Sequence, residues 1–205
     1  KTVFEEHYPK FNLDKLLYFP HPNYIDVYGR EVEKVTTDDE LVLLYMGLIN
    51  PYKNLDMLIS VFNELNLPKA KLIIRGSIKD GRQAYYESLI DDNPKIDAKF
   101  GFVPDSEIPE LFSKAHISVT PYDLEVSLNS GANILSFSYA TTVLGVLNGT
   151  LKDIPDKSLF FGYEYSFKDE HREKIKQNMK DIYLRYEEKF NDLNIIGKST
   201  KQFVA

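Results

Sequence analysis

Two glycine-containing turns hold residue types that can bind a phosphate group. The first runs from Gly47 to Lys53 as Gly-Leu-Ile-Asn-Pro-Tyr-Lys and follows an apolar run. Gly47 lets the backbone approach a ligand closely, and Lys53, near a helix start, can meet a phosphate that the helix dipole also favours. The alternative is structural: Gly47 only forms a turn, and Lys53 faces solvent.

The second turn precedes another apolar helical pattern. Asn129 or Ser130 can cap a helix that begins near Gly131, which leaves free backbone N–H groups for a phosphate. The alternative is an ordinary capped core helix, whose inward residues are Ile134, Leu135 and Phe137. Both turns are expected at one edge of a sheet, and this proximity favours a binding site.

Other polar residues near these turns allow two interpretations each. Asp123 and Glu125 can accept hydrogen bonds from ribose or sugar hydroxyls, or they are exposed loop acids. Arg75, which ends a predicted strand, either reaches a phosphate or pairs with a neighbouring acid. His116 is interpreted as structural, and His21, within Pro-His-Pro, as part of a linker.

The composition excludes several classes of function. The chain has 205 residues, 43% of them hydrophobic, which suits one globular domain with or without an appended arm. Its net charge of −6 argues against nucleic acid as a partner. The absence of cysteine excludes disulfides and thiolate catalysis, and the four scattered His residues lack metal-ligand spacing, so no metal site is predicted.

Neither a membrane span nor a signal peptide is predicted. No apolar run approaches the roughly 18 residues that a spanning helix needs, and the N-terminus lacks the basic-then-apolar order of a secretory signal. The chain also begins in the middle of a pattern, as though it were cut from something longer. We therefore expect a cytoplasmic location, or the inner membrane surface in a full-length protein.

Strand-length apolar runs alternate with helical patterns along the chain. Strands are predicted at 15–19, 41–46, 71–75, 98–103, 117–120, 142–144 and 158–161. Helices are predicted from Pro51 up to Pro68, at about 82–91, at 106–114 with Asp105 as N-cap, from Gly131 onward, and at about 169–190. This order predicts an α/β fold, a Rossmann-like doubly wound parallel sheet with helices on both faces and a C-terminal helical arm.

In such open sheets, ligands bind outside the carboxyl ends of the strands. The turns expected to carry the chemistry are therefore 47–54, 76–81, 102–105 and 121–131. The final helix has one apolar side and one side dense in Lys and Glu. We interpret it as an arm that packs on another part of a longer protein.

Four segments, taken in order, resemble the C-terminal, nucleotide-sugar-binding domain of GT-B glycosyltransferases of the retaining family 4 type. They read LVLLYMGLINPYKNLDMLISVFNEL, AKLIIRGS, KFGFVPDSEIPELFSKAHISVTPY and NSGANILSFSYATTVLG. The match spans about residues 16–165, and FPHPNYIDVYG is similar to the segment that enters this domain. The resemblance implies a linker or end of an N-terminal domain at 1–28, the nucleotide-sugar-binding domain at 29–166, and the arm at 167–205.

The resemblance implies the donor-binding half of a hexosyltransferase. It would transfer a sugar from a nucleotide-diphosphate sugar to a glycan or lipid-linked acceptor, with retention of configuration and without an obligatory metal or other cofactor. Transfer would occur in a cleft with an N-terminal domain, during synthesis of bacterial polysaccharide or a related glycan. The protein would act mainly by neutralising the diphosphate leaving group and by holding the sugar in place.

The resemblance also assigns binding residues, although it assigns no catalytic residue. Donor and phosphate contacts are expected at Gly47, Asn50, Lys53, Gly76, Ser130, Gly131 and Ala132. Nucleobase and ribose contacts are expected at Phe102, Val103, Glu125 and Asn129.

Five positions depart from the family pattern. They are Leu48 in place of Arg, Ser127 and Leu135 in place of a Glu pair, Ala140 in place of Gly, and Thr142 in place of Pro. The second of those acids holds the ribose hydroxyls in the family, and a leucine at 135 has no oxygen to do so. Either Glu125 or Asn129 substitutes, or the chain is a degenerate, non-catalytic GT-B half that acts as a binding or scaffolding domain.

Overall fold

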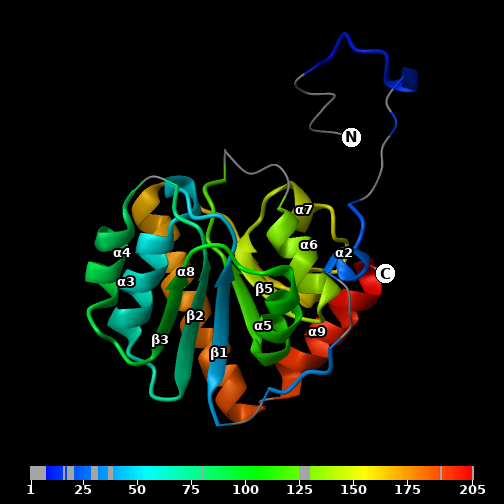
Figure 1. Cartoon of the computed structure of the whole chain (residues 1–205). Coiled ribbons are helices and arrows are strands. Elements are labelled where there is room, and N and C mark those ends of the chain that lie inside the picture. Colours follow the sequence, from blue (N-terminus) through cyan, green and yellow to red (C-terminus); the bar gives the residue numbers. More distant parts are fainter. Residues whose placement is uncertain are drawn as a thin grey trace.

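A six-stranded sheet forms the centre of the molecule, with the strand order β3-β2-β1-β4-β5-β6 (Figure 1). The structure is a computed structural model that describes residues 8–15, 17, 21–28, 32–36, 39–79, 81–124, 130–189 and 191–204. The strands are β1 Leu41–Met46, β2 Ala70–Gly76, β3 Ile96–Phe100, β4 Ile117–Thr120, β5 Thr142–Val146 and β6 Phe161–Tyr163. Every neighbouring pair is parallel, so the predicted doubly wound, Rossmann-like sheet is confirmed.

The position of β1 in the middle of the sheet explains why its sequence is almost entirely apolar. Successive side chains of a strand point to opposite faces. Leu43 and Tyr45 pack into the cluster on one face of the sheet, whereas Leu44 and Met46 pack into the cluster on the other. A strand buried on both faces needs an apolar residue at nearly every position.

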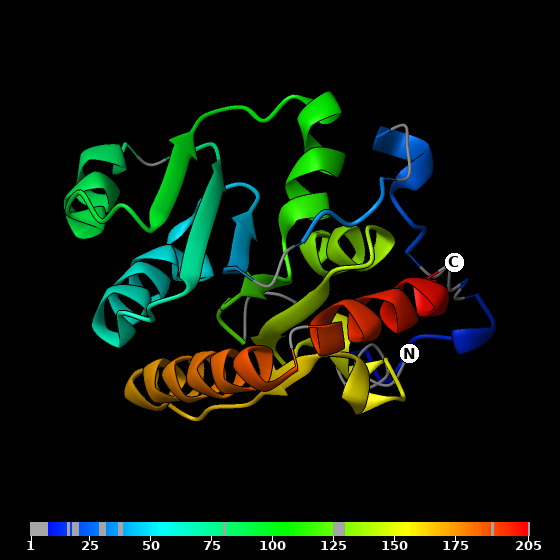
Figure 2. The ribbon, with the colours of Figure 1, turned by 90° about the horizontal axis from the view of Figure 1, so that it is seen from below.

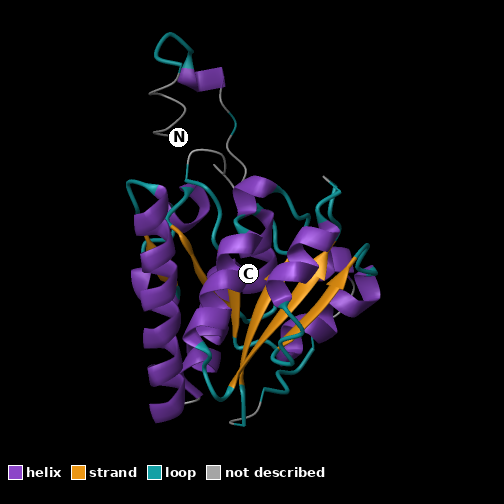
Figure 3. Cartoon of the chain, turned by 90° about the vertical axis from the view of Figure 1, so that its left-hand side faces the viewer, coloured by secondary structure: helices purple, strands orange, loops and turns teal. Residues whose placement is uncertain are grey.

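Helices cover both faces of the sheet (Figures 2 and 3). The residues of the two apolar clusters place α3 Leu55–Leu65, α4 Gln83–Ile90 and α8 Lys168–Glu188 on one face. They place α2 Ile25–Tyr28, α5 Ile108–Lys114 and α6 Gly131–Ser138 on the other. The remaining elements are α7 Gly149–Lys152, α9 Asn191–Val204, and the 3-10 turns η1 Leu13–Lys15, η2 Pro51–Lys53, η3 Asp105–Glu107 and η4 Lys157–Leu159.

The C-terminal helices pack on this same domain. α8 buries Ile175, Met179 and Ile182, which recur at helical spacing, in the core that it shares with α3. Arg172 of α8 also pairs with Glu64 of α3 at 2.6 Å. The prediction that this arm packs on another part of a longer protein was therefore wrong for its apolar side, because that side completes the core of the sheet.

Several predicted boundaries move. Asp105 is not an N-cap, because it begins the 3-10 turn η3; Glu107 precedes α5, and neither residue makes a side-chain capping bond. The strand predicted at 98–103 is Ile96–Phe100, and the one predicted at 158–161 is replaced by η4 and a later β6. The strand predicted at 15–19 lies mostly outside the described residues, and its first residue, Lys15, ends the turn η1.

Candidate functional site

The sheet order creates a switch point between β1 and β4. The chain leaves β1 toward α3 on one face and leaves β4 toward α6 on the other, so the two connections diverge from adjacent strand ends. A crevice at such a point is the usual ligand site of doubly wound sheets. The turn after β1 and the residues around the start of α6 both lie at this edge, as the sequence predicted.

Backbone contact between two glycines shapes the first turn. Gly76, at φ +154°, lies so close to Gly47 that a Cβ atom on Gly76 would collide with the Gly47 carbonyl. The Gly47 N–H donates to the Arg75 carbonyl at 3.0 Å. Gly76 was predicted to contact the donor; the structure gives it a packing reason, and a donor contact stays a prediction.

Lys53 lies over this glycine turn. Its Nζ atom is 3.4 Å from the position that a Cβ atom on Gly47 would occupy, and 4.9 Å from the centre of the Tyr122 ring. Burial lowers the pKa of Lys53, and no carboxylate forms an ion pair with it among the described residues. A half-buried cation in this position is stabilised by a bound anion.

Asn54 links the first turn to the second by hydrogen bonds, although the sequence did not point to this residue. Its backbone is left-handed, at φ 51°, and its side chain is fully buried. The amide Nδ2 donates to the Pro121 carbonyl and to Asp123 Oδ1, both at 2.8 Å. Its Oδ1 accepts a hydrogen bond from Lys168, the first residue of α8. Asn54 therefore fixes the backbone that carries Lys53.

Asp123 is part of this network and is not simply an exposed loop acid. Its backbone N–H donates to the Tyr52 carbonyl at 2.7 Å, and Lys168 Nζ lies 3.8 Å from its carboxylate. The Tyr165 hydroxyl lies 3.5 Å from the same carboxylate and accepts from the Leu124 N–H at 3.0 Å. These contacts hold the start of the second turn against α8.

Ser130 caps α6, so it is the capping residue of the two that the sequence offered, Asn129 and Ser130. Its Oγ accepts from the Asn133 N–H at 3.2 Å, and its own N–H donates to Thr150 Oγ1 at 2.9 Å. The N–H groups of Gly131 and Ala132 donate to no acceptor among the described residues. The first turn of α6 therefore presents donors that an anion can use.

Of the residues predicted to contact the base and the ribose, the structure describes only Phe102 and Val103. Phe102 follows β3, two strands from β1 or about 10 Å away, and its side chain is 82% exposed. Val103 beside it packs partly against the cluster of α5 and α6. Glu125 and Asn129, together with Ser127, lie outside the described residues. Of the expected contacts, the structure thus brings Gly47, Lys53 and the α6 start to one switch point, with Phe102 to one side.

The departures from the family pattern also have a structural setting. Leu135 is buried in the cluster between α5 and α6, so position 135 is a core position in this chain. Ala140 has a left-handed backbone, at φ 52°, which is the conformation that glycine favours. Leu48, where the family has Arg, is half-buried after Gly47.

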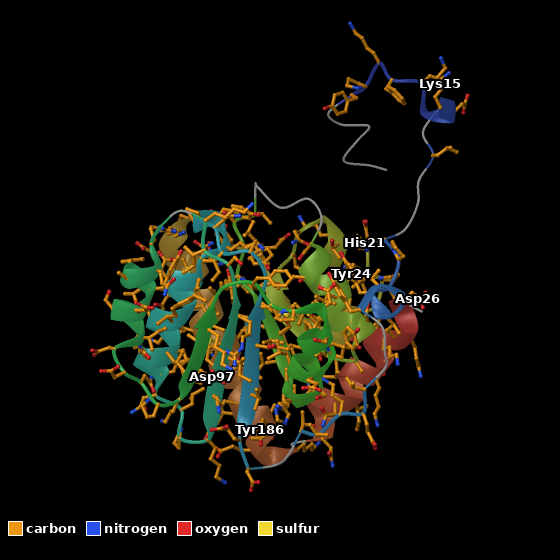
Figure 4. All side chains as sticks on the ribbon, viewed as in Figure 1. Lys15, His21, Tyr24, Asp26, Asp97 and Tyr186 are labelled. Carbon is orange, nitrogen blue, oxygen red and sulfur yellow. The ribbon has the colours of Figure 1, made fainter. Side chains whose placement is uncertain are left out.

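The structure also shows the surroundings of Arg75, His116 and Asn50, which the sequence analysis singled out. Arg75 pairs with Asp97 at 2.9 Å (Asp97 is labelled in Figure 4), and this hydrogen bond lowers the pKa of Asp97. His116 is structural, because its buried ring accepts a hydrogen bond from the Val42 N–H at 3.0 Å. Asn50 precedes η2, and its carbonyl accepts from the Lys53 N–H at 3.0 Å, without a side-chain capping bond.

The described part of the chain shows neither a metal site nor a membrane-spanning helix. It contains no cluster of three or more His, Cys, Asp or Glu side chains that could hold a metal ion. None of the helices within these ranges is both long enough and apolar enough to cross a membrane.

The chain is similar in sequence to known glycosyltransferases. Residues 30–127 match the family Glycosyl transferases group 1. The chain is 26% identical over 151 residues to a GDP-mannose:glycolipid 4-beta-D-mannosyltransferase of Xanthomonas campestris pv. campestris, covering 72% of this chain and 42% of that protein. The chain therefore spans less than half the length of this curated relative.

Solved structures share the fold at low sequence identity. A glycosyltransferase from Rickettsia africae ESF-5 superposes with a TM-score of 0.74 at 12% identity, over 99% of this chain and 56% of that one. HepE of Anabaena, in complex with UDP and glucose, gives a TM-score of 0.64 at 14% identity, over 81% of this chain and 44% of that one. Residues 30–127 are thus similar in sequence to the family Glycosyl transferases group 1, and the chain has a GT-B-like fold.

Proposed function

We propose that the chain is the donor-binding half of a hexosyltransferase that uses a nucleotide-diphosphate sugar. One observation carries the proposal: Lys53 is a half-buried cation at the switch point, without a carboxylate partner among the described residues. A diphosphate at this position would pair with Lys53 and accept hydrogen bonds from the first turn of α6. Gly47, Asn50 and Gly76 would let the backbone approach the same group.

The donor proposed first is GDP-mannose. The Xanthomonas relative is named as an enzyme that uses GDP-mannose, and it aligns with 72% of this chain. Phe102 and Val103 would frame the base beside the exposed end of β3, and Glu125 or Asn129 would bind the ribose hydroxyls. UDP-sugars are the competing donors, because HepE of Anabaena was solved with UDP and with UDP-glucose.

Transfer would depend on electrostatic stabilisation of the leaving diphosphate. Negative charge grows on that group as the bond to the sugar breaks, and fixed donors aimed at it lower the barrier. Lys53 would supply the positive charge, because Leu48 leaves the first turn without the family's second cation. No obligatory metal is proposed, so activity should survive treatment with a chelator.

The acceptor and the stereochemistry belong to the full-length protein. We infer a glycan or lipid-linked acceptor, bound by an N-terminal domain in the cytoplasm and used in bacterial polysaccharide synthesis. Retention of configuration is proposed from the resemblance to family 4. The 4-beta-D linkage in the name of the Xanthomonas relative makes the product anomer, measured by NMR, the decisive test of that point.

Calorimetric titration of the chain with GDP, UDP, ADP and TDP tests the binding site. We expect one of these nucleotides to bind and Lys53→Ala to weaken it about 10- to 100-fold, the value of a hydrogen bond between charged groups. Lys180→Ala, on the exposed side of α8, makes the same charge change away from the site and should leave the affinity unchanged. The site assignment fails if no nucleotide binds, or if both variants bind equally well.

The burial of Leu135 favours one alternative function. A leucine packed in the core in place of the family's acid fits a degenerate, non-catalytic GT-B half that binds a partner or ligand. Transfer assays on the full-length protein with the nucleotide that binds would distinguish the two. Tight nucleotide binding without transfer to any glycan or lipid-linked acceptor would support the binding domain.

A further inference from the structure

Tyr24 extends along α6 and ends at the proposed diphosphate site. Its backbone N–H donates to Ser138 Oγ, at the last residue of α6, at 2.9 Å. At the other end of the helix, its hydroxyl lies 2.9 Å from where a Cβ atom on Gly131 would be. Between these ends its ring packs with the apolar side of α6. The Tyr24 hydroxyl thus occupies the space that glycine leaves open at the first residue of α6.

His21 joins this hydroxyl from the segment before α2. Its Nε2 atom is 3.2 Å from Tyr24 Oη, and its Nδ1 atom is 2.9 Å from the Pro22 carbonyl. Because a carbonyl only accepts, Nδ1 carries a proton, and Nε2 of the neutral ring accepts from the Tyr24 hydroxyl. Burial raises the pKa of Tyr24, so its hydroxyl keeps its proton. Figure 4 shows the two labelled side chains next to each other beside α6.

Asn133 provides an independent sign that a ligand belongs here. It is fully buried in the first turn of α6, and its Oδ1 accepts from Thr120 Oγ1 at 2.9 Å. Its Nδ2 has no acceptor in the part of the chain that the structure describes. Its bond to Thr120, the last residue of β4, places this amide beside the carboxyl end of that strand. Buried amides rarely lack an acceptor, and a phosphate oxygen or its bound water would supply one.

We propose that Tyr24 and His21 bind the diphosphate of the donor together with the first turn of α6. The inference deepens the proposed function and depends on it. When the donor binds, the Tyr24 hydroxyl donates to a phosphate oxygen, and the neighbouring His21 ring keeps this hydroxyl at the start of α6. Tyr28 stacks on Tyr24 at 5.5 Å, and no carboxylate among the described residues pairs with His21.

This pair compensates for Leu48. The family places a second cation beside the diphosphate, directly after the glycine of the first turn, and this chain has leucine there. The Tyr24 hydroxyl, in contact with His21, supplies a hydrogen-bond donor in its place. The segment His21–Tyr24 is then a ligand-binding segment as well as the entry to the domain.

Tyr24→Phe tests the proposal with little disturbance, because it removes one oxygen and keeps the ring against α6. In calorimetric titrations with GDP, we expect binding to be weaker by about 10-fold or more, as for a lost hydrogen bond to a charged group. Binding of guanosine, which lacks the diphosphate, should not change. Tyr28→Phe is the matched control and should bind GDP as the unmodified chain does. His21→Ala, at an exposed position, should weaken GDP binding about threefold.

The outcomes separate this proposal from the one on which it rests. If GDP binding requires Lys53 but is unchanged in both Tyr24→Phe and His21→Ala, the role of this pair is refuted and the proposed function stands. Equal losses for GDP and guanosine in Tyr24→Phe would also refute it, because they indicate a structural effect. If GDP, UDP, ADP and TDP all fail to bind the unmodified chain, both proposals fail together.

Discussion

The two turns at the switch point offer different binding groups to the same proposed ligand. The turn after β1 is held by side chains: Asn54 links it to the turn after β4 and to α8, and Lys53 supplies its charge. The start of α6 supplies backbone donors and the Asn133 Nδ2, which has no acceptor among the described residues; Ser130 caps this helix. One turn thus provides a positioned charge, and the other provides oriented dipoles.

This difference predicts different consequences of mutation. The first turn packs against Gly76 of β2 and is hydrogen-bonded to α8 through Asn54. Changes in this turn should therefore lower the free energy of unfolding as well as the ligand affinity. The first turn of α6 adds its donors at the end of a helix whose other residues are already packed. Changes at its cap should therefore cost less stability.

Gly76→Ala should have the largest effect, because it disrupts the first turn directly. A Cβ atom there collides with the Gly47 carbonyl, and φ +154° is a conformation that alanine rarely adopts. We expect a loss of about 3 kcal/mol or more in the free energy of unfolding, measured by urea denaturation. Gly81→Ala is the control: at φ +70° with open space around it, it should cost only about 1 kcal/mol. Similar losses for both variants would show that the contact between the two glycines is unimportant.

The sequence predicted the order of strands and helices well, because apolar periodicity determines which residues are buried. It also located the turns that carry Lys53 and Ser130, because glycine and capping residues have local signatures. It did not reveal Asn54 or Lys168, since their hydrogen bonds join residues 114 positions apart. Tyr24 was missed for the same reason: its partner Ser138 lies 114 residues further along the chain.

Acid should weaken the attachment of α8 to the two turns through His171. This buried ring stacks on Tyr165, a neighbour of Asp123, at 4.0 Å, and its Nε2 is 3.0 Å from the Tyr163 hydroxyl. Burial, reinforced by the charge of Lys168, lowers the pKa of His171 from 6.5 to about 4. Above pH 6.5 the stabilisation is complete; as the pH falls toward 4, the unfolded chain takes up a proton that the folded chain excludes. The loss should reach about 2 to 3 kcal/mol.

The measurement is urea denaturation at a series of pH values, compared with His171→Gln. The variant has no proton to take up at this position, so its stability should fall less steeply between pH 6.5 and 4. Parallel profiles for the two proteins would exclude a depressed pKa at His171. An NMR titration of the imidazole provides a direct check, since the ring should remain neutral at pH 5.

Asn54 tests how far side chains, rather than backbone, hold the first turn. Asn54→Gly keeps the left-handed backbone and removes the side-chain hydrogen bonds to Pro121 and Asp123. Asn54→Ala removes the same hydrogen bonds and also strains the backbone. We expect losses of about 1 kcal/mol for glycine and about 2 kcal/mol for alanine in urea denaturation. Both should weaken nucleotide binding, because Lys53 loses its support. Full nucleotide affinity in Asn54→Gly would mean that the side-chain network does not position Lys53.

Ser130→Ala should have the smallest effect on stability and distinguishes the two turns most clearly. The cap hydrogen bond from the Asn133 N–H to Ser130 Oγ is lost, which typically costs about 1 kcal/mol. The backbone donors at Gly131 and Ala132 remain, so GDP affinity should fall only about two- to threefold, far less than for Lys53→Ala. The two variants should lose GDP affinity to different degrees because Lys53 places a charge on one side of the ligand, whereas α6 places only backbone dipoles on the other. A larger loss of GDP affinity in Ser130→Ala than in Lys53→Ala would reverse the assignment and make the start of α6 the dominant phosphate contact.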